Sequence, residues 1–301
     1  MRYGIPYQGS KNAIAQKLID ALPSAETFVD LFAGGCAVTH AAMLSGKYER
    51  FIINDINPLS VQCFVDAIHG KYKNETRWIS REDFWRLRDT DAYAKYCFSF
   101  GNGGYSYMYG RELEPYKRAI HYAVVFEQYD DLQALFPDTD LSTVKAGKTS
   151  TERRLAWSRL AKQDKTERKY AELESLQRLE RLERLQSLQR LERLERLERL
   201  ERLEMHVGSY DAVEIPENAV VYCDIPYLTD SNGKRQKDKR MYDDASSFDH
   251  KKFWDWAIKR GNVYVSEYTA PEGVKWVAEW ERHSHMDAYG SGRVTERLFR
   301  T

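Results

Sequence analysis

Residues 27–38 read TFVDLFAGGCAV, and this stretch decides the fold. TFVDLFAGG is a short β-rich run that stops at the glycine pair Gly34–Gly35. Residues 36–48, CAVTHAAMLSGKY, then have a helical pattern, and residues 51–58, FIINDINP, form a second strand-like run that ends at Asn, Asp and Pro. Strand, helix and strand in this order predict a parallel pair in a doubly wound α/β sheet.

The composition limits the function classes. The chain has 301 residues, with 46 basic and 46 acidic side chains, so its formal net charge is zero. A nucleic-acid-binding protein with this balance needs local basic patches, because it has no global positive field. No apolar run approaches the length that crosses a bilayer, and the N-terminal residues lack an apolar signal core. We therefore predict a cytoplasmic protein with no membrane partner.

The cysteines argue against a metal or disulfide framework. Cys36, Cys63, Cys97 and Cys223 lie far apart in the sequence. Their spacing matches neither a zinc site nor a disulfide-rich scaffold. We predict reduced thiols and no bound metal.

The α/β pattern is split in two. It covers residues 1–60 and returns at 207–301, whereas residues 61–206 are mostly helical in pattern. In this middle part Ser80 stands three residues before Asp83, a capping-box-like helix start, and residues 115–136 have helical spacing. We predict one discontinuous α/β domain that is interrupted by a helical insertion.

A leucine repeat closes the insertion. Leu recurs at every third residue from Leu173 to Leu203, among Glu, Arg, Gln and Ser. Leu, Glu and Arg favour helices, so we predict a helix over 173–204. At 100° per residue its apolar stripe spirals around the axis and forms no regular heptad seam. Three interpretations stay open: a tandem expansion whose length hardly matters, an oligomerisation helix and a DNA-facing arm. We expect a monomer or a weak oligomer formed through this helix.

The glycine pair predicts a ligand site. Gly34 and Gly35 let the backbone approach a ligand closely at the carboxyl end of a strand, where such sheets bind ligands. The sequence has no G-x-G-x-x-G cradle and no Walker lysine. Asp55, about 20 residues further on, is placed to bind both hydroxyls of a ribose. A ligand with an adenosyl ribose and no pyrophosphate fits, and S-adenosylmethionine is the one we predict. The alternative for each motif alone is a helix start and a turn aspartate.

Residues 220–227, VVYCDIPY, predict another strand that ends at the same edge of the sheet. An exocyclic amine on a base is a poor nucleophile because its lone pair is delocalised into the ring. The Asp224 carboxylate and the Ile225 carbonyl would accept its two hydrogens and stabilise the positive charge that develops during methyl transfer. Tyr227 would stack on a base swung out of the duplex, and Pro226 would fix the turn. The alternative is a strand that simply ends in a turn.

Taken in order, these motifs resemble the Dam-like adenine-specific DNA methyltransferases, in particular the phage and prophage branch. PYQGSK at 6–11 is similar to the family's N-terminal cofactor motif, and DLFAGG at 30–35 is similar to its cofactor loop. NDIN at 54–57 resembles the ribose motif, and DIPY at 224–227 stands where the family has D-P-P-Y. VYVSEY and RVTERLF resemble its late strands.

The resemblance implies a Rossmann-like fold that uses S-adenosylmethionine to methylate N6 of a flipped adenine in double-stranded DNA, with no metal. It implies these cofactor-binding residues: Tyr7, Lys11, Asp30, Phe32, Gly34, Gly35, Asp55 and Asp224. It also implies a bacterial or phage-encoded enzyme, of the kind found in restriction-modification systems.

Ile225 departs from the family pattern. Ile retains the backbone carbonyl but lacks the fixed φ of proline, so we expect a less preorganised turn and reduced or conditional activity. The alternatives are a catalytically weakened protein that binds S-adenosylmethionine and DNA, a structural protein organised by the leucine repeat, and an enzyme that acts on RNA or cytosine.

Two segments are candidates for DNA contact. A basic loop after the catalytic turn would neutralise phosphates through Lys234, Arg235, Lys237, Lys239 and Arg240. A Gly- and aromatic-rich loop at 98–109 would touch base edges, or fill the space left by the flipped base, through Asn102 and Tyr105. No recognition sequence follows from these residues.

Overall fold

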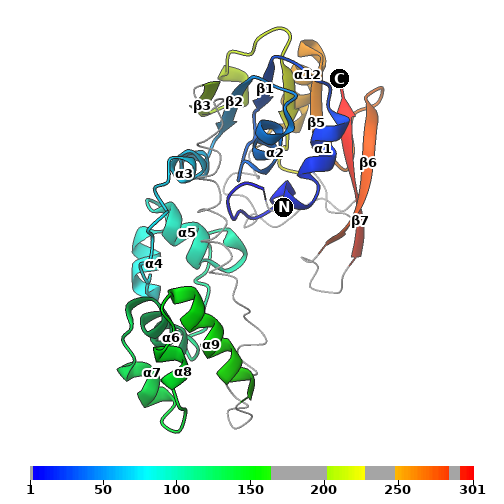
Figure 1. The fold of residues 1–301 in the computed structure, drawn as a ribbon. Coiled ribbons are helices and arrows are strands. Elements are labelled where there is room, and N and C mark those ends of the chain that lie inside the picture. Colours follow the sequence, from blue (N-terminus) through cyan, green and yellow to red (C-terminus); the bar gives the residue numbers. More distant parts are fainter. Residues whose placement is uncertain (1–2, 164–201, 228–247, 285–291) are drawn as a thin grey trace.

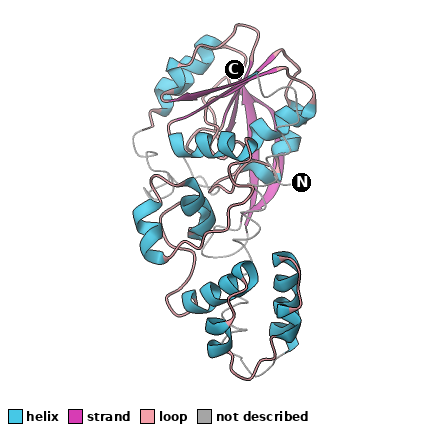
Figure 2. Cartoon of the chain, turned by 60° about the vertical axis from the view of Figure 1, so that its left-hand side comes forward, coloured by secondary structure: helices cyan, strands magenta, loops and turns pink. Residues whose placement is uncertain are grey.

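The computed structural model describes residues 3–163, 202–227, 248–284 and 292–301. Within these ranges, seven strands form one sheet in the order β3-β2-β1-β4-β5-β7-β6 (Figure 1). The strands are β1 Thr27–Asp30, β2 Arg50–Asp55, β3 Leu203–Val207, β4 Val220–Cys223, β5 Val263–Glu267, β6 Lys275–Ser284 and β7 Gly292–Arg300. Helices cover both faces of the sheet (Figure 2). The predicted α/β class is confirmed.

The direction of the strands places the site. β3, β2, β1, β4 and β5 run parallel, with Phe28 of β1 opposite Phe51 of β2, so the predicted parallel pair is confirmed. β7 runs antiparallel between β5 and β6. Because parallel strands end at the same edge, the turns that follow β1, β2 and β4 meet there.

The helices are α1 Ala15–Ala21, α2 Ala37–Ser45, α3 Pro58–Ile68, α4 Arg81–Leu87, α5 Ala92–Phe98, α6 Glu114–Phe126, α7 Asp130–Leu135, α8 Ser142–Lys145, α9 Ser150–Gln163 and α12 His250–Arg260, with 3₁₀ turns η1 Lys11–Ala13, η2 Phe100–Asn102 and η5 Tyr210–Ala212. The predicted cap is confirmed, since the Ser80 side chain accepts a hydrogen bond from the backbone N–H of Asp83. The helical pattern at 115–136 resolves into α6 and α7, because Glu127 adopts φ 60° and ends α6.

Side-chain alternation along the strands divides the core into two clusters. In β2, Phe51 and Ile53 point to the face that α1, α2 and α3 cover, whereas Ile52 points to the face that α12 covers. Successive strand residues face opposite sides of a sheet, so every central strand contributes to both clusters. The short central strands β1 and β4 are buried along their whole length, as expected for parallel strands that are covered on both faces.

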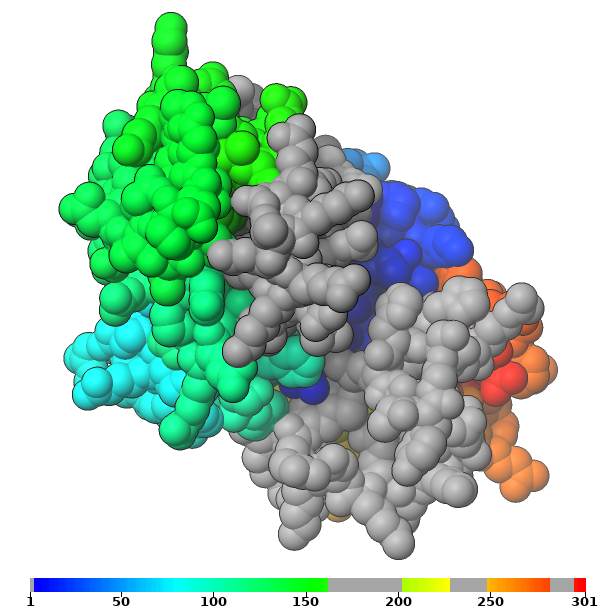
Figure 3. Space-filling model, turned by 90° about the horizontal axis from the view of Figure 1, so that it is seen from below, coloured from blue at the N-terminus to red at the C-terminus, as the bar shows by residue number. Residues whose placement is uncertain are grey.

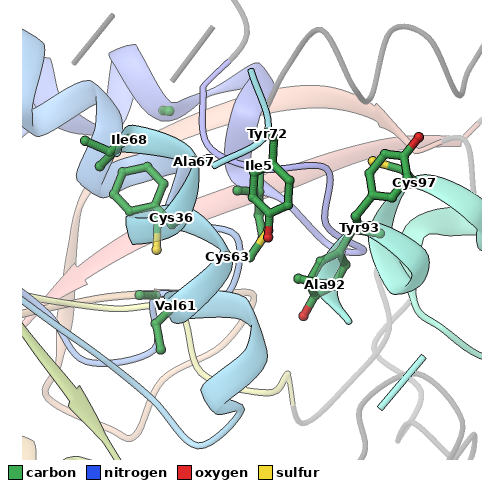
Figure 4. Close-up of a cluster of buried hydrophobic side chains, with 14 of the residues drawn as sticks. Ile5, Cys36, Val61, Cys63, Ala67, Ile68, Tyr72, Ala92, Tyr93 and Cys97 are labelled. Carbon is green, nitrogen blue, oxygen red and sulfur yellow. The ribbon is translucent and has the colours of Figure 1, made fainter. Parts of the chain in front are cut away.

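The helical insertion extends away from the sheet. Figure 3 shows α6–α9 on one side of the molecule and the N-terminal segment with β6 and β7 on the other. Cys63 and Tyr72, in and just after α3, share one buried cluster with Cys97 of α5 and with Ile5 and Cys36 of the sheet domain, so this cluster joins the insertion to the sheet domain (Figure 4). All four cysteines are buried with free thiols, as their spacing predicted. Within the described ranges, no helix has the length and apolarity needed to cross a bilayer.

The end of the leucine repeat differs from its predicted helix. Leu203 and Glu204 begin β3, which pairs in parallel with β2, with Glu204 opposite Ile52. The edge of β2 offers backbone groups that need partners, and this pairing outweighs the helix propensity of Leu and Glu. The rest of the predicted repeat helix lies outside the described residues. The division into a domain of 1–60 and 207–301 and an insertion of 61–206 stays a prediction, with its second boundary at the end of β3.

Candidate active site

A cavity of about 370 Å³ opens at the carboxyl ends of β1, β2 and β4. Its wall includes every residue predicted to bind the cofactor: Tyr7, Lys11, Asp30, Phe32, Gly34, Gly35, Asp55 and Asp224. These residues lie far apart in the sequence, and the parallel strands bring them together. Asp224 and Pro226 of the predicted catalytic turn also line it.

The glycine pair after β1 is packed against the N-terminal motif. A Cβ atom on Gly35 would lie 2.5 Å from the Cβ of Tyr7, and one on Gly34 would lie 2.9 Å from the Tyr7 ring. Gly34 also adopts φ 47°, which L side chains rarely take. The backbone N–H of Ile5 donates to the Gly35 carbonyl at 2.9 Å. These contacts explain why the loop needs glycine at both positions.

Asp55 bridges two turns at the end of β2. Its carboxylate accepts hydrogen bonds from the backbone N–H groups of Gly34, at 2.7 Å, and Asn57, at 2.9 Å. Burial raises the pKa of Asp55, while these hydrogen bonds act in the opposite direction. The backbone N–H of Ile56 also acts on this carboxylate, so one of its four lone-pair sites remains for a further donor such as a ribose hydroxyl.

Asp30 gives the cavity a buried acid. Its Oδ2 accepts a hydrogen bond from the Thr39 hydroxyl at 2.7 Å, and its Oδ1 has no hydrogen-bond partner among the described residues. Burial raises the pKa of Asp30 to about 7, and the negative charges of Asp224 and Asp55 act in the same direction. The wall of the cavity contains four carboxylates, of Asp30, Asp55, Asp224 and Asp249, and three ammonium groups, of Lys11, Lys95 and Lys252. The three carboxylates at the ends of β1, β2 and β4 form the part of the wall that favours a positively charged ligand.

Asp224, directly after β4, pairs with the N-terminal lysine. Lys11 Nζ lies 2.8 Å from Asp224 Oδ1 and 3.2 Å from Glu296 Oε1. The same ammonium lies 4.7 Å from the centre of the Tyr227 ring, and the Tyr227 hydroxyl donates to Glu296. Lys11 lines the cavity, but its ammonium group contacts Asp224 and Tyr227 of the catalytic turn.

The structure differs from the sequence prediction at Ile225 and Tyr227. The Ile225 side chain is 1% exposed and belongs to the apolar cluster under α12, so burial holds a turn that the missing proline was expected to leave loose. Tyr227 was predicted to stack on the flipped base, but its ring is buried between Lys11 and Tyr268. Its hydroxyl is bound to Glu296, which keeps the ring behind the cavity wall.

His250 supports the other end of the catalytic turn. Its Nε2 lies 2.6 Å from the Pro226 carbonyl, and since a carbonyl only accepts, Nε2 carries the proton. The ring is also perpendicular to Phe248, at 4.9 Å between centroids. His250 is the first residue of α12, so this helix fixes both the apolar floor under Ile225 and the carbonyl of Pro226.

Sequence reasoning missed part of the cavity wall. The missed residues include Lys95 and Tyr96 of α5, Gly208, Ser209 and Tyr210 after β3, and Phe248, Asp249 and Lys252 around the start of α12. The loop after β3 could not be predicted from the sequence, because β3 itself begins inside the leucine repeat. A recognisable signal was available for α12, where Asp249 caps the helix by accepting from the N–H of Lys252.

The two DNA-contact candidates have different outcomes. Asn102 and Tyr105 line the same cavity as Asp55 and Asp224, on the side formed by the insertion. Backbone hydrogen bonds from Phe100 to Ser106 and from Met108 to Phe98 hold this loop as a narrow hairpin. The predicted phosphate-binding residues Lys234, Arg235, Lys237, Lys239 and Arg240 lie outside the described residues.

Comparison with protein families supplies the decisive observation. The model of the D12 class N6 adenine-specific DNA methyltransferase family matches residues 7–130. Over these residues the chain is similar to this family. The match confirms the predicted resemblance and the predicted activity, the methylation of adenine at N6 in DNA. Comparison with curated proteins finds no match.

The matched range covers part of the methyltransferase site. It includes Tyr7, Lys11, the glycine pair, Asp55 and the 98–109 loop, together with the helices up to the start of α7. It ends before β4, so the match does not reach Asp224 or Glu296. The roles of individual residues therefore rest on the geometry of the cavity.

Proposed function

We propose that the cavity binds S-adenosylmethionine with its ribose on Asp55 and its cationic part near Asp30 and Asp224. The residues fit this ligand in three ways. Asp55 keeps acceptor capacity at the end of β2, and the glycine pair permits close approach. Asp30 lies in the cavity wall with a buried Oδ1 that has no hydrogen-bond partner among the described residues, and its carboxylate attracts a positively charged ligand. When bound, S-adenosylmethionine supplies an electrophilic methyl group on a positively charged sulfur.

Asp224 and the carbonyl of Ile225 then act on the adenine. They accept the two hydrogens of the N6 amine, which localises its lone pair and stabilises the positive charge that develops there. The single observation that carries this role is that Asp224 lies in the wall of the same cavity as Asp55 and the glycine pair. A base that enters this cavity is oriented against the methyl donor, which lowers the entropic part of the barrier.

The insertion side of the cavity is proposed to meet DNA. Phe100, at the start of the hairpin, has 65% of its surface exposed, and Tyr105 has 37% exposed. Large apolar side chains beside a base-binding cavity are suited to stacking on nucleotides. With Asn102 they would form the base-facing side, while the basic loop at 234–240 would supply phosphate contacts. Double-stranded DNA is the proposed partner.

Methyl transfer to mixed-sequence duplex DNA tests this proposal. The purified protein is incubated with S-adenosylmethionine carrying a labelled methyl group, and the DNA is digested to nucleosides for mass spectrometry. We expect N6-methyladenine, and loss of the product in Asp224→Asn. Cofactor binding without methylated adenine would favour the weakened binding protein instead. Methylated cytosine, or a product formed only on RNA, would contradict the proposed substrate.

The cellular setting is also a proposal. We propose a bacterial or phage-encoded enzyme that acts in the cytoplasm, as a monomer or a weak oligomer. Sequencing of modified bases in DNA from cells that express the protein tests the activity and defines the recognition site together. Methylation scattered over adenines in every sequence context would contradict a site-specific enzyme.

A further inference from the structure

Glu296 is a fully buried acid with no role in the proposed chemistry. It lies on β7, opposite Trp280 of β6, and is 0% exposed. A buried carboxylate destabilises the folded state unless charged or hydrogen-bonding groups compensate it. Its Oε1 lies 3.2 Å from Lys11 Nζ and accepts a hydrogen bond from Tyr227. The compensation comes from the catalytic turn and from the motif that contacts it.

The four side chains Glu296, Lys11, Tyr227 and Asp224, which we call the lysine bridge, join three distant segments. One ammonium lies between two carboxylates, at 2.8 Å from Asp224 and 3.2 Å from Glu296. The Tyr227 ring lies 4.7 Å below this ammonium, and the edge of Tyr268 meets that ring at 4.7 Å between centroids. A rigid aromatic base thus holds the lysine between the two acids.

We propose that Glu296 is a positioning residue for methyl transfer: by sharing Lys11 with Asp224 and by holding Tyr227, it keeps the Asp224 carboxylate oriented into the cavity as a hydrogen-bond acceptor. This inference rests on the proposed role of Asp224. A lysine paired with Asp224 alone would neutralise it and compete with the adenine amine. With Glu296 present, the two acids and one ammonium carry a net negative charge, so Asp224 keeps acceptor strength.

The lysine bridge also accounts for the departure at Ile225. In a D-P-P-Y turn, the second residue has its φ fixed by the proline ring. Here the turn is held from outside, by the burial of Ile225, by the His250 bond to Pro226 and by the lysine bridge at both Asp224 and Tyr227. Side chains from α12 and β7 therefore take over a constraint that proline supplies locally.

Glu296→Gln tests the inference most directly. The glutamine carbonyl still accepts from Tyr227, but the negative charge is lost, so Lys11 pairs with Asp224 alone. We expect kcat for DNA methylation to fall by about 10- to 100-fold, while KM for S-adenosylmethionine changes by less than about twofold. Tyr227→Phe removes only the hydroxyl, and we expect a smaller fall of about 3- to 10-fold. The double variant should lose less than the product of the two single losses, because both act through one network.

Glu279→Gln is the matched control. Glu279 lies on the neighbouring strand β6 and pairs with Arg297 at 3.3 Å, on an exposed part of the sheet. We expect wild-type kcat and KM from this variant. Thermal unfolding of each variant shows whether a kinetic effect comes with a general loss of stability.

Three outcomes overturn the inference. The first is wild-type kcat in folded Glu296→Gln, and the second is a fall in kcat that is matched by equal losses in cofactor affinity and thermal stability. If Glu296→Gln does not fold, Tyr227→Phe decides, and wild-type kcat in that variant is the third. Asp224→Asn separates the two proposals. Full activity there overturns the role of Asp224, whereas inactive Asp224→Asn beside fully active Glu296→Gln overturns only the role of Glu296.

Discussion

The loop after β1 and the turn after β4 both line one cavity, but different interactions hold them in place. In the first, backbone groups dominate: Gly34 and Gly35 pack under Tyr7, and the Gly34 N–H binds Asp55. In the second, side chains dominate: Lys11, Glu296 and His250 hold Asp224–Tyr227. A loop that is held by its own backbone can be recognised from its own residues, here the two glycines. A turn that is held by side chains depends on residues that lie far away in the sequence.

The largest expected effect removes the acceptor of the side-chain-held turn. In Asp224→Ala the N6 amine loses its charged acceptor, and we expect kcat to fall on the order of 10³-fold, the scale measured when one charge-stabilising group is removed from an active site. Labelled methyl transfer to duplex DNA under saturating cofactor measures this. Cofactor affinity should fall far less, because Asp30 and Asp55 remain. Equal losses in kcat and affinity would place Asp224 in cofactor binding alone.

Ile225 tests whether burial holds the same turn. Ile225→Ala leaves a cavity in the cluster under α12, and we expect the free energy of unfolding to fall by about 2–4 kcal/mol, with Ile225→Val costing about 0.5–1.5 kcal/mol. Urea unfolding of both variants measures these changes. Ile258→Ala is the control, since that side chain is 51% exposed on the same helix. A change of under 0.5 kcal/mol in Ile225→Ala would show that the turn does not depend on this contact.

Gly35→Ala addresses the backbone-held loop. Its new Cβ would lie 2.5 Å from the Cβ of Tyr7, so the N-terminal motif must move away from the cofactor loop. We expect a cost of about 1–3 kcal/mol, seen as weaker S-adenosylmethionine binding by calorimetry. Gly110→Ala is the matched control, because nothing lies within 4 Å of its Cβ position. Wild-type affinity in Gly35→Ala would mean that Tyr7 need not contact the loop.

The smallest expected effect is a pH dependence of the affinity for S-adenosylmethionine, which arises in the cavity between the two regions. The pKa of Asp30 is about 7, and a cationic ligand favours its ionised form. We expect the affinity for S-adenosylmethionine to rise by up to about tenfold per pH unit below pH 7 and to level off above it. Calorimetry between pH 5.5 and pH 8 measures this, and Asp30→Asn should remove the slope. If the affinity of Asp30→Asn depends on pH as strongly as that of the wild type, another group carries the proton that is lost on binding.

The stability of the ligand-free protein should respond to Asp30 in the opposite direction. Because its pKa is raised in the folded state from 3.8, its contribution to stability is complete below pH 3.8 and is lost as the pH rises through about 7. His40 opposes this: burial lowers its pKa to about 4, so its contribution is present above pH 6.5 and is lost as the pH falls through about 4. Comparing Asp30→Asn with the wild type separates the two.

Prediction from sequence succeeded where a constraint is local. The strand, glycine pair and helix at 27–38, the parallel partner that ends at Asp55, and the Ser80 cap all follow from residues that lie next to one another. The residues predicted to bind the cofactor line one cavity because parallel strands bring their carboxyl ends to one edge, and their binding role stays a prediction.

Prediction failed where the constraint comes from tertiary contacts. The burial of Tyr227 depends on Glu296, 69 positions away, and nothing in D-I-P-Y predicts that partner. The helix predicted over 173–204 takes in Leu203 and Glu204 because Leu and Glu favour helices in isolation, whereas the open edge of β2 makes these two residues the start of β3. The His250 contact required knowing that the first turn of α12 lies beside Pro226.

The position of β3 at the edge of the sheet has a consequence for changes in the length of the repeat. Asn54 donates to the Gly208 carbonyl although the two residues are 154 positions apart, so the whole insertion and its repeat are one excursion between neighbouring strands. Treated only as chain length, three more residues in an excursion of this size change the closure free energy by less than about 0.1 kcal/mol. Through chain closure alone, the gain or loss of one Leu-containing triplet therefore changes the stability of the sheet domain very little.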